Sequence, residues 1–76
     1  MTYDYSKLRG RVVEKCGTLT HFREKMGLSD RTVSAKFNGL SEWKQSEIVR
    51  ACEILEIPAT DINAYFFNIK VQDNEQ

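Results

Sequence analysis

The sequence contains few cysteine, proline and glycine residues, with two, one and four of them respectively in 76 positions. Two cysteines are too few for a disulfide framework, and with the one histidine they fall short of the four or so ligands of a structural zinc site. No apolar run approaches the roughly 18 residues of a membrane span, and the first residues lack the basic and apolar regions of a signal peptide. We therefore expect a cytoplasmic protein that holds no metal and does not bind a membrane.

The composition is that of an ordinary soluble globular protein, with 41% hydrophobic and 29% charged residues. A chain of this length buries roughly 60% of its unfolded surface, which allows one domain over residues 1–76, with a core at about 5–67 and a tail at 68–76. No carboxylates are paired for acid and base catalysis, and no serine or cysteine has a base network beside it. We predict that the protein is not an enzyme and takes no cofactor or small-molecule ligand.

The net charge is zero, but the charges are unevenly distributed along the chain. Residues 1–40 carry eight basic and four acidic side chains, an excess of four positive charges, and residues 41–76 carry the opposite excess. A local basic surface matters more to a polyanion than the charge of the whole chain. The zero net charge therefore does not exclude a nucleic-acid partner.

The apolar residues recur three or four positions apart and predict an all-α fold of five helices. The expected ranges are 5–16, 19–26, 30–37, 45–56 and 59–66. Thr18 and Ser29 suit the N-caps of the second and third helices, and Gly17 and Gly27 suit helix ends. If Lys44 is the N-cap of the fourth helix, Trp43 and Ile48 occupy the two positions of a hydrophobic staple.

Beyond the last predicted helix the apolar pattern changes its period. Phe67, Ile69 and Val71 alternate with polar residues, which predicts a short strand or an extended tail. This segment is more apolar than the end of a small domain usually is. We therefore predict that Phe67, Ile69 and Val71 contribute to a two-fold dimer contact.

Two short helices joined by a turn at Gly27 are the arrangement in which one helix braces another in the major groove of DNA. In that arrangement the outward side of the third helix carries short or forked polar side chains and no bulky apolar one. These outward residues are Asp30, Arg31, Ser34, Ala35 and, at the helix end, Asn38. Such a surface can approach base edges closely.

At this point the sequence resembles the phage repressor and Cro-type helix-turn-helix family, which has the lambda repressor-like fold, and its short members from phages of Gram-positive hosts most closely. The resemblance spans about 60 of the 76 residues, from Leu8 to Phe67. The matching stretches within that span are Leu8 to Lys15, Gly17-Thr18, Met26 to Ser29, Arg31 to Ser34, Asn38-Gly39, Trp43 to Ile48 and Tyr65 to Phe67. The sequence departs from the family pattern at Arg23, where alanine is usual, and at Leu19, where a phosphate-clamping glutamine is usual. The resemblance implies a compact five-helix domain with the second and third helices as the helix-turn-helix.

The resemblance also implies which side chains meet DNA. Arg31 can bond a guanine edge bidentately, and Ser34, Ala35 and Asp30 complete the predicted base-reading set. Both Arg31 and Lys36 are expected to point outward. The predicted phosphate contacts are Ser29, Lys36, Asn38, Thr18 and Thr20.

We therefore predict a sequence-specific transcriptional regulator, a phage or prophage repressor or Cro-like protein, that binds double-stranded operator DNA as a homodimer. A second hypothesis is a protein-interaction module on the same scaffold, such as an antirepressor or an antitoxin. The basic first half and the short side chains of the third helix favour DNA, but a fold alone does not determine the ligand.

Overall fold

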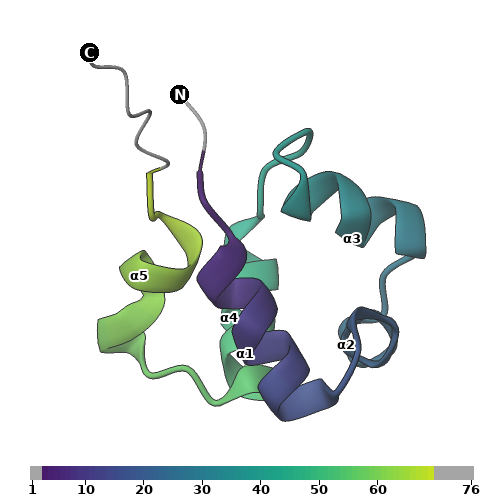
Figure 1. Cartoon of the computed structure of the whole chain (residues 1–76), viewed down its shortest axis with the longest axis horizontal. Helices are drawn as coiled ribbons and strands as arrows, with labels where there is room; N and C mark the ends of the chain where they lie inside the picture. The colour runs from purple at the N-terminus through teal and green to yellow at the C-terminus, as the bar shows by residue number, and fades with distance from the viewer. Residues whose placement is uncertain (1–2, 70–76) are drawn as a thin grey trace.

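Five α-helices and one 3-10 turn follow one another along the chain in a computed structural model, which describes residues 3–69 (Figure 1). The elements are α1 (Ser6–Cys16), α2 (Leu19–Met26), α3 (Asp30–Phe37), α4 (Gln45–Leu55), η1 (Ala59–Asp61) and α5 (Ile62–Phe66). The predicted all-α fold with five helices is confirmed. The fifth helix differs from its predicted range, because its first turn is the 3-10 turn η1.

The N-caps of α2 and α3 are the predicted hydroxyl residues. Thr18 Oγ1 accepts a hydrogen bond from the His21 amide at 3.1 Å, and Ser29 Oγ accepts one from the Thr32 amide at 3.1 Å. Gly27 ends α2 in the left-handed conformation, with φ of 74°, and its amide bonds back to two carbonyls of the last turn. A residue with a Cβ would be strained there, so the sharp turn into α3 depends on this glycine.

The start of α4 also follows its prediction. Lys44 is the N-cap residue, and its amide donates to Glu47 Oε1 at 2.8 Å. The helix ends one residue earlier than expected, because Glu56 adopts a left-handed conformation with φ of 55°. The Arg11 guanidinium from α1 donates to the carbonyls of Leu55 at 2.9 Å and Glu56 at 2.8 Å. These bonds satisfy helix-end carbonyls that have no partner within α4.

The core lies where α1, α2 and α4 pack together, with α5 closing one side. Its most deeply buried large side chains are Phe22, Phe66, Leu8, Leu55 and Val12. A row of edge-to-face rings crosses it, from Phe22 to Phe37 (centroids 6.3 Å apart), to Trp43 (5.5 Å) and to Phe66 (5.2 Å). This row connects α2, α3, the loop before α4, and α5.

The two ends of the described chain pair with each other. Tyr3 and Ile69 form an isolated antiparallel bridge, and the Asp4 amide donates to the Asn68 carbonyl at 2.6 Å. Of the strand or tail predicted from Phe67 onward, the structure shows this one bridge, and residues 70–72 lie outside the described range. Within residues 3–69, no helix is long and apolar enough to cross a membrane.

Candidate functional site

The outer side of α3 is the surface on which the predicted DNA-reading residues meet. The turn of residues 27–29 sets α3 against α2 so that Val33 and Phe37 are buried with Phe22 and Met26. The opposite side carries Asp30, Arg31, Ser34, Ala35 and Asn38, which we call the α3 face; four of these side chains are exposed and Ala35 is half-buried. In Figure 1, α3 lies at the edge of the molecule, away from α5.

Arg31 is the exposed, uncommitted cation of the α3 face. Among residues 3–69, no hydrogen bond or ion pair engages its guanidinium. Its neighbour Asp30 lies 3.8 Å from Arg23 Nε of α2, at the limit of an ion pair. The start of α3 therefore presents the free guanidinium of Arg31 beside the carboxylate of Asp30. The sum of these two charges is close to zero.

The predicted phosphate contacts lie at the starts of α2 and α3 and at the end of α3. The Thr18 and Ser29 hydroxyls accept the capping bonds already described, and Ser29 Oγ also lies 2.8 Å from Thr32 Oγ1. Thr20 is exposed in the first turn of α2. Asn38 Oδ1 accepts from Arg9 Nη2 at 3.4 Å, which brings a cation of α1 to the end of α3.

Lys36 does not point outward, and this expectation was wrong. Its side chain is 3% exposed, and its ammonium donates to Glu47 Oε1 at 2.7 Å and to the Glu42 carbonyl at 2.9 Å. It also lies over the Trp43 ring, 5.9 Å from the centroid. The cause is tertiary, because the Glu47 carboxylate of α4 and the Glu42 carbonyl of the loop before it lie beside Lys36. Lys36 is therefore not available to a phosphate.

Glu47 is the partner of Lys36, and the sequence did not reveal this pairing, because the two residues lie on different helices. Burial raises the pKa of Glu47, but the hydrogen bonds from Lys36 and from the Lys44 amide, with the two lysine charges, outweigh burial and hold the pKa below its ordinary value. One carboxylate thus caps α4 and neutralises the only buried charged side chain on the inner side of α3 within residues 3–69.

Arg23 occupies the place where the family pattern expects alanine. The side chain is half-buried and forms ion pairs with Glu24 Oε2 at 3.9 Å and Asp30 Oδ1 at 3.8 Å. Its Nε is buried without a hydrogen-bond partner in the described part of the chain. The larger residue is accommodated because it spans from α2 to the start of α3.

Two of the three side chains predicted for a dimer contact are apolar and exposed in the structure. Phe67 is 46% exposed and Ile69 is 47% exposed, and Tyr3, at 40%, packs against Phe67 with ring centroids 6.1 Å apart. Val71, the third predicted contact, lies outside the described residues.

A phage regulatory protein of known structure shares this small all-helical fold. The chain belongs to the family described as a protein of unknown function (DUF739), which matches residues 1–69. It is 53% identical to the modulator of repression (MOR) of the temperate bacteriophage TP901-1 from Lactococcus lactis, whose solution structure superposes with a TM-score of 0.79 over 95% of this chain and 97% of that chain. No curated protein matches the sequence. Similarity to a phage regulator is thus confirmed, and membership of the repressor and Cro family stays a prediction.

Proposed function

We propose that this chain is a cytoplasmic phage regulatory protein, a single domain that modulates repression through its α3 face. The observation that carries this proposal is the 53% identity to a phage modulator of repression over nearly the whole of both chains. The exposed and uncommitted Arg31 on α3 supports it, because a functional surface needs side chains that the fold itself does not use.

Operator DNA is the ligand that the shape of the α3 face favours. In this proposal α2 and α3 act as a helix-turn-helix, with Arg31, Ser34, Ala35 and Asp30 at base edges. The phosphates of the DNA backbone would contact the hydroxyl and amide side chains that flank this base-reading set, namely Ser29, Asn38, Thr18 and Thr20. Two copies would bind together, joined at Phe67 and Ile69, with Val71 as a further contact.

A regulatory protein, such as a repressor, is the second candidate ligand. Burial of Lys36 against Glu47 removes a cation from the set expected to meet phosphates. Phosphate contacts depend on uncompensated lysine and arginine charges, so the near-neutral start of α3 is better suited to a protein surface than to a polyanion. A modulator of repression, as the similar phage protein is named, can also act on the repressor.

Gel-shift titrations separate the two ligands. The intact chain is titrated onto promoter fragments of its own phage, alone and with the repressor of that phage. A shift by the chain alone identifies DNA as the ligand, and a repressor-dependent change identifies the protein. Arg31→Ala should weaken either effect, and Lys7→Ala is the matched control because Lys7 lies over the Tyr65 ring of α5, outside the α3 face. Absence of any effect with both ligands would refute the proposal.

A further inference from the structure

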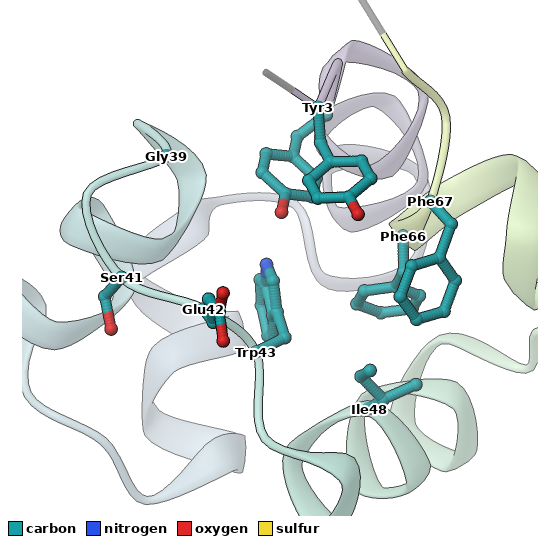
Figure 2. A pocket seen from close by; sticks show the side chains of 9 residues that line it. Tyr3, Gly39, Ser41, Glu42, Trp43, Ile48, Phe66 and Phe67 are labelled. Carbon is teal, nitrogen blue, oxygen red and sulfur yellow. The ribbon is translucent and has the colours of Figure 1, made fainter. Parts of the chain in front are cut away.

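A second site lies beside the loop that follows α3. A cavity of about 330 Å³ opens where the N-terminal segment, residues 39–43 and the end of α5 meet (Figure 2). Five aromatic side chains line it, namely Tyr3, Tyr5, Trp43, Phe66 and Phe67. Two polar groups of this pocket have no partner within residues 3–69.

The first of these groups is the indole nitrogen of Trp43. Trp43 Nε1 is buried and has no hydrogen-bond partner among the residues that the structure describes. In Figure 2 it points into the pocket, toward the side on which Tyr3 lies. A buried N–H without an acceptor is unfavourable, so an occupant that supplies an acceptor oxygen is stabilised here.

The second group is the carboxylate of Glu42. It is exposed at the rim of the pocket, and no cation within residues 3–69 forms an ion pair with it. The nearby ammonium of Lys36 bonds the Glu42 main-chain carbonyl and is neutralised by Glu47 instead. The pocket therefore carries one uncompensated negative charge. Burial, and then the nearby Tyr3 and Glu42, raise the pKa of Tyr5, which keeps its phenol neutral.

The rings themselves favour a cation. Trp43 and Phe66 meet edge to face with centroids 5.2 Å apart, and Tyr3 meets Phe67 in the same way at 6.1 Å. The faces of aromatic rings carry negative potential and attract cations, and a planar guanidinium both stacks on a ring and bonds a carboxylate bidentately. An acidic rim over aromatic walls is therefore complementary to arginine.

We propose that this aromatic pocket binds an arginine side chain from an exposed segment of a partner protein. The guanidinium stacks on the rings and pairs with Glu42, and a main-chain carbonyl of the same segment accepts the hydrogen bond of Trp43 Nε1. The proposal is independent of what the α3 face binds, since none of its contacts uses Arg31 or Ser34.

The test uses the single tryptophan of the chain, because its indole N–H gives one resolved signal in a ¹H–¹⁵N NMR spectrum. The intact protein is titrated with the blocked peptide acetyl-Gly-Arg-Gly-amide and with the corresponding Gln and Glu peptides. We expect the Arg peptide to shift the Trp43 signal saturably, with an affinity at least about threefold above the Gln peptide and higher still above the Glu peptide.

Variants identify the counter-ion. Glu42→Gln should weaken the Arg peptide about three- to tenfold and leave the Gln peptide unchanged. Glu53→Gln, an exposed position on α4 outside this pocket, is the matched control and should change neither. Equal binding of all three peptides, no binding of any, or an unchanged Arg affinity in Glu42→Gln would each overturn the proposal. The protein concentration is held constant throughout, because dimerisation through Phe67, which lines this pocket, would itself shift the Trp43 signal.

Discussion

The ammonium of Lys36 and the carboxylate of Glu47 form an ion pair of 2.7 Å in the seam between α3 and α4, where the lysine side chain is 3% and the glutamate side chain 13% exposed. Three further contacts surround this pair: the Glu42 carbonyl, the Trp43 ring and the Lys44 amide. The α3 face is therefore oriented from behind by a polar contact as well as by the apolar core.

Removing one partner of this pair should destabilise the protein markedly. Glu47→Ala leaves a buried ammonium without its counter-ion, and we expect a loss of about 3 kcal/mol in the free energy of unfolding. Chemical denaturation measures it. The exposed pair of Lys15 and Glu56 is the control, and Lys15→Ala should cost about 1 kcal/mol or less. Equal losses in the two variants would show that the buried pair does not stabilise the fold.

The same pair predicts a dependence of stability on acid. The folded pKa of Glu47 lies below its ordinary value of 4.5, so the stabilisation is complete above pH 4.5 and is lost as the pH falls through the lower folded pKa. The free energy of unfolding, measured by denaturation at pH 3 to 7, should therefore fall on the acid side of 4.5. Glu47→Gln should flatten that decline, and a variant with the full wild-type slope would contradict the assignment.

Arg31 carries the prediction for base reading. Arg31→Ala should cost about 1 to 3 kcal/mol per half-site in operator affinity and relax the preference at one base position. The side chain is exposed and makes no contact within the described residues, so the melting temperature should barely change. Binding to an operator and to its single-base variants at fixed salt measures the effect. If Arg31→Ala leaves the base preference unchanged, Arg31 does not read a base, and Ser34 or Asn38 becomes the next residue to test.

Direct DNA binding should also depend strongly on salt. A dimer that contacts on the order of 6 to 10 phosphates loses about 10³ to 10⁵ in affinity between 50 and 200 mM salt. Footprints should show two half-sites about 34 to 36 Å apart. A salt-independent interaction, or a single asymmetric half-site, would favour the protein ligand instead.

The left-handed residue at the end of α4 predicts a substitution that stabilises the protein. Glu56 holds a left-handed conformation, which costs a residue with a Cβ about 1 to 2 kcal/mol. Glu56→Gly removes this strain at the expense of a weak exposed ion pair with Lys15, so the free energy of unfolding should rise by roughly 1 kcal/mol. Glu53→Gly, in the interior of the same helix, should lower it by about 1 kcal/mol. Thermal melting of both variants measures the difference, and a loss in each would refute the strain.

Local chemistry made the helices predictable, because caps such as Thr18 and Ser29 and the terminator Gly27 act within a few residues of themselves. The composition of the α3 face followed from the same periodicity. The burial of Lys36 did not, because its partners belong to the next helix and its approach. From sequence alone, a charged residue on a short helix is predicted to be exposed to solvent. Only the tertiary arrangement shows that a counter-ion lies beside it. The aromatic pocket was missed for the same reason, since its walls come from both ends of the chain.

The bridge between Tyr3 and Ile69 has a consequence for the connectivity of the fold. It places the first and last described residues side by side, so a short linker can join them without stretching any helix (Figure 1). A circularly permuted chain, cut between Gly39 and Leu40 in the exposed loop after α3, would keep all five helices intact. The five helices can thus form the same fold when they follow one another along the chain in a different order.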